Sequence, residues 1–363
     1  MEDKLLDSKR LKFGVYESAL ASLLFVIYNF LFIQLYGFVP KDLRSVEILS
    51  FVASFFLEAT FAFAAITVAC SKKVDIKAAA GMKKKVNGKI VWLGFWIAVV
   101  SIIGLGDITN LFLQILTACG YKSVLSDFSI NTVWQYLGYL IASCAAPAFC
   151  EELLFRGTIM SGLKEYGAKI AIIVSAVIFT FMHGNAEQTV HQMIIGVLIG
   201  YIFWKSGNLW LGVIIHFFNN FLSVTASFVI SLLNKGQAAE AASSPLGGLG
   251  MLYLIVETVI TALVALYLLK LLLDSLLAED HKLNGENVEN TNLSTITIDG
   301  QESVVEMAIE SDSTGVKSDM VDENKAEVEK KPISTSTVVF FAISGLYLAF
   351  EWIATLLIGF GLV

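Results

Sequence analysis

Long apolar segments, separated by short polar ones, follow one another along most of this chain of 363 residues. A helix that crosses the hydrocarbon core of a bilayer needs about 20 apolar residues. The pattern therefore predicts nine membrane-spanning helices, with eight as the alternative count. Their approximate bounds are 13–38, 47–70, 90–118, 132–156, 170–183, 188–204, 208–233, 249–275 and 334–362. The expected fold is an all-α, polytopic membrane helix bundle.

Composition supports a membrane protein and excludes a soluble one. Hydrophobic residues make up 56% of the chain and charged residues 16%, and the mean hydropathy is +0.71. An average soluble domain carries about 25% charged residues. No concentrated basic surface suggests a nucleic-acid partner. The four cysteines lie in or at the ends of apolar stretches without C-x-x-C spacing, which favours buried thiols.

One segment differs from the rest. Residues 279–331 contain fourteen Asp or Glu and five Lys, a local charge of −9, and residues 279–333 include no aromatic side chain. Such a segment cannot bury enough apolar surface to fold alone. We therefore expect a membrane bundle at 1–275 with its catalytic core at about 130–235. A disordered acidic cytoplasmic linker at 276–333 and a C-terminal transmembrane helix at 334–363 would follow it.

Lysine and arginine placement predicts the orientation, because basic loops resist translocation. Alternate loops differ strongly in these residues. One set holds Lys4, Lys9, Arg10, Lys12, Lys72, Lys73, Lys77, Lys83, Lys84, Lys85, Lys89, Lys164, Lys169, Lys205, Lys270 and Lys282. The other set holds only Lys41, Arg44, Lys122 and Lys235. The N-terminus is therefore expected in the cytoplasm.

Ionisable residues inside membrane helices are costly, at about 2.5–3.5 kcal/mol each on insertion scales, and often functional. Glu151, Glu152 and Arg156 lie together in the fourth predicted helix. Glu152 and Arg156, four residues apart, share a helix face and can form an ion pair. Glu151 points about 100° away from Glu152 and has no local cation. It is therefore the candidate general base, while the alternative interpretation is an ordinary helix end at the interface.

Three further polar residues lie on neighbouring helices. His183 ends the fifth predicted helix, and His216 and Asn220 share one face of the seventh. A carboxylate, two imidazoles and a carboxamide provide a base, a water ligand and donors for an oxyanion. The chain has no Gly-x-Ser-x-Gly elbow and no His-Glu-x-x-His zinc helix. Water is therefore the expected nucleophile.

The order of these motifs resembles a known family. Glu151-Glu152-x-x-x-Arg156, Phe179-x-x-x-His183 and His216-x-x-x-Asn220 are similar to the three motifs of the CAAX-protease and bacteriocin-processing (ABI) family of intramembrane proteases, which includes type II CAAX prenyl endopeptidases. The resemblance implies an endopeptidase that cleaves a peptide or membrane-tethered protein near the cytoplasmic face, in the plasma membrane of a bacterium. It further implies that Glu151 activates water, that His183 positions the water, and that His216 and Asn220 stabilise the oxyanion. Glu152 and Arg156 would hold the helix of Glu151 in register.

The family is often classed with the metalloendopeptidases, and this leaves the cofactor open. Glu151, His183 and His216 would supply three ligands to a divalent metal such as zinc. Asn220, however, is a poor zinc ligand and a good oxyanion donor. We therefore expect a mechanism that requires no cofactor. A catalytically silent scaffold or immunity protein, and a proton-coupled transporter, are the alternative functions.

Other polar residues in the predicted helices are interpreted as structural. Asp107 follows a Gly-x-Gly sequence, as in intramembrane aspartyl proteases, but that chemistry requires two aspartates. Glu58 is a lone carboxylate with no histidine nearby in sequence. Glu187 and His191 are spaced to form a pair at the interface, and Gly196-x-x-x-Gly200 is typical of helix contacts.

The predicted topology restricts how the motifs meet. The fourth helix would run towards the cytoplasm and end near Arg156, whereas the fifth would carry His183 away from it. The two motifs meet only if the fourth helix continues past Arg156 or if the short fifth helix stops partway across the membrane.

Overall fold

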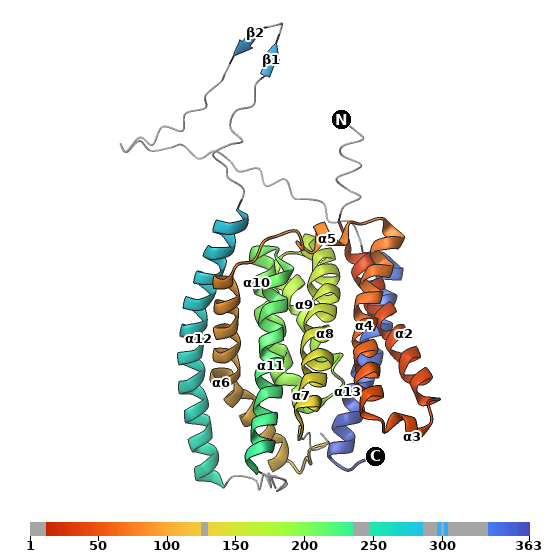
Figure 1. Cartoon of the computed structure of the whole chain (residues 1–363), viewed down its shortest axis with the longest axis vertical. Coiled ribbons are helices and arrows are strands. Elements are labelled where there is room, and N and C mark those ends of the chain that lie inside the picture. The colour runs from red at the N-terminus through yellow and green to blue at the C-terminus, as the bar shows by residue number, and fades with distance from the viewer. Residues whose placement is uncertain (1–11, 125–129, 235–246, 286–295, 299–300, 304–332) are drawn as a thin grey trace. The chain divides into compact units, whose positions relative to one another are not determined.

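The computed structural model describes residues 12–124, 130–234, 247–285, 296–298, 301–303 and 333–363 (Figure 1). Each of the nine segments predicted to span the membrane is helical. The helices are α2 (Val15–Gly37), α4 (Glu47–Lys72), α6 (Gly88–Ala118), a continuous helix over Val133–Met160, α9 (Ala168–Phe181), α10 (Thr189–Ser206), α11 (Leu209–Asn234), α12 (Gly248–Asn284) and α13 (Thr335–Gly359). The protein is therefore a polytopic helical membrane bundle, as predicted.

Short elements connect the long helices. They are α3 (Lys41–Arg44), α5 (Ile76–Ala79) and two 3-10 turns, Lys164–Tyr166 and Ala186–Gln188. Two short strands, β1 (Ile296–Ile298) and β2 (Gln301–Ser303), pair antiparallel with each other, with Thr297 opposite Glu302. These two strands fall in the segment predicted to be a disordered linker, most of which lies outside the described residues.

Seven of the nine helices are long and apolar enough to cross a membrane. The exceptions are α9 and α10. With 14 residues, α9 reaches roughly 21 Å, less than a hydrocarbon core of about 30 Å. The 18 residues of α10 include His191 and Lys205, which lower its hydropathy.

The fourth predicted helix is longer than its sequence pattern suggested. It runs from Val133 to Met160 through α7 (Val133–Tyr139) and α8 (Ala146–Leu154), with π-helical turns at Leu140–Ala145 and Phe155–Met160. It begins at a capping box, in which the Thr132 hydroxyl accepts from the Gln135 amide at 3.1 Å. Its continuation past Arg156 places Glu151 well inside the helix.

The loops meet at two ends of the bundle. At the first, the Leu209 amide donates to the Ala80 carbonyl at 3.2 Å, and Lys89 pairs with Glu279 at 2.8 Å. We call this end, which gathers Lys12, the loop 72–89, Lys164, Lys205 and the last turns of α12, the lysine-rich end. At the opposite end, the Lys122 amide donates to the Gly359 carbonyl at 2.8 Å. In Figure 1, α5 lies at the first end and α3 at the second.

The C-terminal part of α12 corrects the predicted start of the linker. The helix continues to Asn284, past the expected boundary at 275. Two acidic residues in this extension are buried in contacts with the bundle: Glu279 accepts from Asn87 at 2.8 Å, and Asp280 accepts from Asn208 at 2.7 Å. These hydrogen bonds explain why an acidic stretch remains helical.

A row of aromatic rings joins the helices that carry the motifs. Phe25 of α2 stacks on Phe61 of α4 with centroids 4.2 Å apart, and Phe61 lies 6.2 Å from Phe155. Phe155 in turn meets Phe179 of α9 edge to face at 5.3 Å. Each such pair contributes about 0.5–1.5 kcal/mol beyond area burial. The row fixes α4 and α9 against the helix that bears Glu151.

Candidate active site

The three motifs converge on one cavity of about 310 Å³ inside the bundle. Glu151 is 4% exposed there, and His216 is 3% exposed. The lining residues come from six helices or turns and are mostly polar: Glu58, Ser143, Pro147, Glu151, His183, Gln188, Gln192, His216, Asn220, Ser223 and Val224. The structure thus brings Glu151, His183, His216 and Asn220 to one site.

Glu152 and Arg156 form the predicted ion pair behind the cavity. Arg156 Nη1 donates to Glu152 Oε1 at 3.0 Å, and both side chains are at most 1% exposed. Arg156 Nη2 donates to the Gly196 carbonyl at 2.9 Å, and its guanidinium lies 4.8 Å from the Phe179 ring centroid. The pair therefore ties the helix of Glu151 to both α9 and α10.

His216 is oriented by the same glutamate. Its Nδ1 lies 2.9 Å from Glu152 Oε1, so Nδ1–H donates to the carboxylate. Its Nε2 then faces Glu151, 3.9 Å from Oε2. A Cβ at Gly212 would lie 3.0 Å from Glu152 Oε2, so the glycine permits this close approach of α11. Glu152 therefore positions His216 as well as the helix, which the sequence did not show.

His183 is held in one tautomer by its own helix. The Nδ1 atom lies 2.8 Å from the Phe179 carbonyl, which can only accept. The proton is therefore on Nδ1, and the Nε2 lone pair is left for a proton of water in the cavity. Phe179, the first residue of the Phe179-x-x-x-His183 motif, thus supplies the carbonyl that orients the His183 ring.

The side chain of Asn220 is held by a backbone carbonyl that Pro147 leaves without its helical donor. Because proline has no N–H, the carbonyl of Ser143, four residues earlier, loses its helical donor. Asn220 Nδ2 donates to that carbonyl at 3.0 Å, and the other N–H of the carboxamide remains for a second acceptor. The π-helical turn at Leu140–Ala145 exposes the carbonyl at this position.

Replacing Pro147 by Ala is a test of this arrangement. The new N–H would compete with Asn220 for the Ser143 carbonyl and release the carboxamide. We expect kcat to fall about tenfold, the equivalent of 1.4 kcal/mol, with no loss of thermal stability in detergent. An unchanged kcat would contradict the positioning role of the carbonyl.

Glu58 is the site residue that sequence reasoning missed. It was interpreted as a lone structural carboxylate, yet it lines from α4 the same cavity as Glu151. The Oε2 atoms of both glutamates are buried without a hydrogen-bond partner among the described residues. The sequence did contain a sign of this role, because a carboxylate without a partner is costly in an apolar membrane helix and is often functional there.

Asp107 and Gly196, which were interpreted from the sequence as structural, both contact neighbouring helices. Asp107 accepts from the Thr261 hydroxyl at 2.8 Å and does not line the cavity. Gly196 packs against Ala176, as the helix-contact motif predicted.

The predicted pair between Glu187 and His191 is not found. Glu187 instead accepts from the Ser123 hydroxyl and the Val124 amide, each at 2.8 Å, while His191 Nε2 lies 3.2 Å from Asn219 Nδ2. The cause is the 3-10 turn at Ala186–Gln188, which gives Glu187 a direction different from that on a regular helix.

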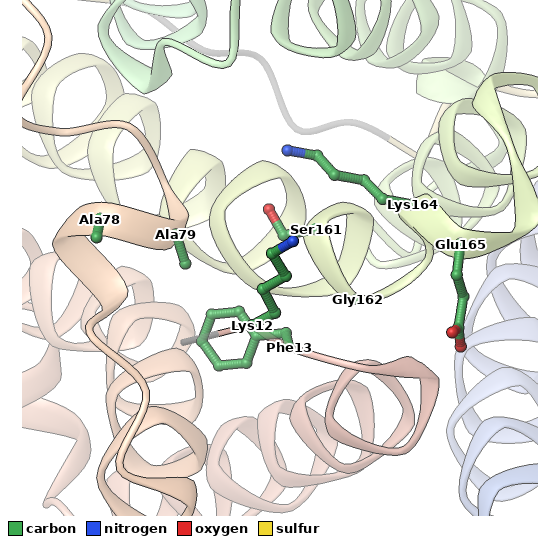
Figure 2. A pocket seen from close by; sticks show the side chains of 8 residues that line it. All are labelled: Lys12, Phe13, Ala78, Ala79, Ser161, Gly162, Lys164 and Glu165. Atoms are coloured by element: carbon green, nitrogen blue, oxygen red, sulfur yellow. The ribbon is translucent and has the colours of Figure 1, made fainter. Parts of the chain in front are cut away.

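A larger hollow of about 790 Å³ lies at the lysine-rich end (Figure 2). Lys12, Ser161, Lys164 and Glu165 are among the residues that line it. Burial and the charges of Lys84 and Lys12 hold the pKa of Lys164 below its ordinary value. The hollow contains no histidine, and we assign the chemistry to the smaller cavity.

The donor set does not match a metal site. Among the residues that the structure describes, no three His, Cys, Asp or Glu side chains are arranged to hold a metal ion. The Nδ1 atoms of His183 and His216 are engaged by Phe179 and Glu152 and leave Nε2 facing the cavity, an orientation that histidines also adopt when they bind a metal through Nε2. We therefore derive no step through a metal.

Comparison with known proteins agrees with the geometry. Residues 132–222 match the model of the Rce1-like family, described as type II CAAX prenyl endopeptidase Rce1-like. No curated protein and no solved structure shows a significant match to the chain. The matched segment contains Glu151, His183, His216 and Asn220 but not Glu58. Over these residues, about a quarter of the chain, the sequence is therefore similar to the type II CAAX prenyl endopeptidases of the Rce1-like family.

Proposed function

We propose that this protein is an intramembrane endopeptidase that hydrolyses a peptide bond with water activated by Glu151. The observation that carries the proposal is the convergence of a buried carboxylate, two oriented imidazoles and a carboxamide on one cavity. The match to the Rce1-like family supports peptidase chemistry.

The first step is attack by water. A water molecule between Glu151 and His183 gives one proton to the Glu151 carboxylate while its second hydrogen is held by His183 Nε2. The oxygen then bonds to the scissile carbonyl carbon, and the carbonyl electrons move to oxygen. A positioned carboxylate of this kind contributes about 10²–10⁴-fold as a general base.

The developing oxyanion needs donors that are already in place. The second N–H of Asn220 is one such donor. His216, whose Nδ1 is held by Glu152, presents its Nε2 edge to the same site. Collapse of the intermediate expels the amine, which takes the proton from Glu151, so that the carboxylate is regenerated.

Comparative peptidomics tests the function and identifies the substrate. Cells carrying the wild-type protein are compared with cells carrying Glu151→Gln at equal protein levels. We expect peptide fragments that occur only with the wild type, and their precursors should accumulate with the variant. Identical peptide sets, together with no cleavage of candidate precursors in proteoliposomes, would reject a peptidase.

Glu58 is proposed to position Glu151. A hydrogen bond between two carboxyl groups holds one proton, which fixes the direction of the Glu151 oxygen that faces the water. We expect Glu58→Ala to lower kcat about 10–100-fold, as for the loss of a hydrogen bond worth 1.5–3 kcal/mol. Glu58→Gln, whose amide can still donate, should stay within about threefold of wild type because that donor is retained. Equal losses in both variants would contradict a donor role.

Chelation tests the metal-independent scheme. Purified protein in detergent, incubated with EDTA or 1,10-phenanthroline and then freed of chelator, is expected to keep its full rate. Elemental analysis of the same sample is the parallel measurement. Loss of activity that zinc restores would instead support a metal site at Glu151, His183 and His216.

A further inference from the structure

The turn between α9 and α10 carries two residues of the site. His183 and Gln188 both line the cavity. Because α9 ends at Phe181 and α10 begins at Thr189, both side chains lie outside the two α-helices. The hydrogen bonds of a regular helix therefore do not fix this turn, and contacts with other segments decide its position. We call residues 182–188 the His183 turn.

The C-terminal helix α13 contacts both ends of the His183 turn. The Thr355 hydroxyl donates to the carbonyl of Gly184, the residue directly after the histidine. The Trp352 Nε1 atom donates to the Thr189 hydroxyl at 2.7 Å, and its indole meets the Phe181 ring edge to face at 5.5 Å. Each of these hydrogen bonds is thus one residue away from a side chain that lines the cavity.

The middle of the turn is held through a loop that is itself bonded to α13. Glu187 is 7% exposed, and the Ser123 hydroxyl and the Val124 amide donate to its carboxylate, each at 2.8 Å. In the same loop, the Lys122 amide donates to the Gly359 carbonyl at the end of α13. The helix therefore supports the turn directly and through this loop.

The other half of α13 is anchored to the part of the bundle that carries the catalytic carboxylate. The Ser22 hydroxyl of α2 donates to the Ser344 hydroxyl at 2.9 Å. On the same helix α2, the Ser18 hydroxyl donates at 2.8 Å to the carbonyl of Ile159, two turns after Glu151 on its helix. A continuous set of contacts thus joins the helix of Glu151 to the His183 turn through α2 and α13.

We propose that α13 is a positioning element of the active site, in which Trp352 and Thr355 hold the His183 turn in place relative to Glu151. The proposal rests on the peptidase function above, because the water must lie between these two groups. A misplacement of about 1 Å can cost about 100-fold in rate. Both positioning residues lie outside the segment 132–222 that matches the Rce1-like family. The site therefore depends on a helix beyond that segment.

Substitutions that keep the shape of α13 test the proposal in a cleavage assay. Thr355→Val removes the hydroxyl, and Trp352→Phe removes the N–H but leaves a ring beside Phe181. Ser344→Ala is the matched control, because it removes a hydrogen bond between α13 and α2 away from the turn. Thr355→Ser keeps the donor to the Gly184 carbonyl.

We expect Thr355→Val and Trp352→Phe each to lower kcat about tenfold, with KM changed by less than about threefold, because the turn shifts while the rest of the cavity stays. Ser344→Ala and Thr355→Ser should keep kcat within about twofold of wild type, since both hydrogen bonds to the turn remain. A purely structural role of α13 would instead predict similar effects of Ser344→Ala and Thr355→Val.

Nuclear magnetic resonance of the histidine rings tests the same geometry without a substrate. The chain has four histidines, so ring-¹⁵N-labelled protein in micelles gives few signals, which are assigned by replacing each histidine in turn. We expect the His183 ring signals to shift in Thr355→Val and Trp352→Phe but not in Ser344→Ala. The signals of His281, in the last turn of α12, should stay in place in all three variants.

The outcomes separate this proposal from the proposed function. An unchanged kcat in both Thr355→Val and Trp352→Phe, or an equal loss in Ser344→Ala, would overturn the positioning role. Unchanged His183 signals in both variants at the turn would overturn it as well. If the wild-type protein cleaves no peptide, the peptidase function fails instead, and the histidine spectra still decide whether α13 positions the turn.

Discussion

Replacing Glu151 by Gln is expected to lower kcat about 10,000-fold with little change in KM or in thermal stability. The carboxamide has nearly the shape of the carboxylate but cannot accept a proton from water. This loss of kcat is at the upper end of the range of about 10²–10⁴-fold for a general base, because the same group also protonates the departing amine. Single-turnover cleavage of an identified substrate in proteoliposomes measures it.

A matched control separates catalysis from the cost of a carboxylate in the membrane. Asp107 also lies in an apolar helix and is hydrogen-bonded, to Thr261, but it does not line the cavity. Asp107→Asn should leave kcat within about twofold, because the substitution keeps an acceptor for Thr261. If Glu151→Gln retains more than a tenth of the wild-type rate, Glu151 is not the base.

Replacing Arg156 by Leu is expected to have the largest effect on stability. The substitution leaves Glu152 buried, charged and without its cation, which costs about 3–5 kcal/mol. It also removes the donor to the Gly196 carbonyl and the cation above Phe179. Denaturation in mixed micelles measures the change, and Lys83→Ala is the control. Lys83 forms an exposed ion pair with Asp75, worth less than about 1 kcal/mol.

A double variant distinguishes the structural role from the catalytic one. Removing both charges, as in Glu152→Met with Arg156→Met, should restore most of the stability, because a buried pair is replaced by apolar side chains. Activity should not return with it, since His216 Nδ1 loses the carboxylate that orients it. Recovery of both properties would mean that Glu152 serves only the packing of its helix.

The positions of the helices could be predicted from the sequence because a membrane helix needs a long apolar run to satisfy its backbone in lipid. Pairs of side chains on the same helix could also be predicted from the sequence. Four-residue spacing places Glu152 beside Arg156 whatever the rest of the fold, and it also determines that Glu151 faces elsewhere. The extension of α12 was missed because its acidic residues remain helical only through partners on other segments.

The sequence alone determined the helical bundle, the Glu152–Arg156 pair and the identity of the four polar side chains of the site. Only the tertiary structure decided that Glu58 lines the same cavity as Glu151 and that the Ser143 carbonyl is held by Asn220. Local features follow from spacing along one helix. Contacts between helices depend on how far each helix reaches and how it packs, and no single segment of the chain encodes this.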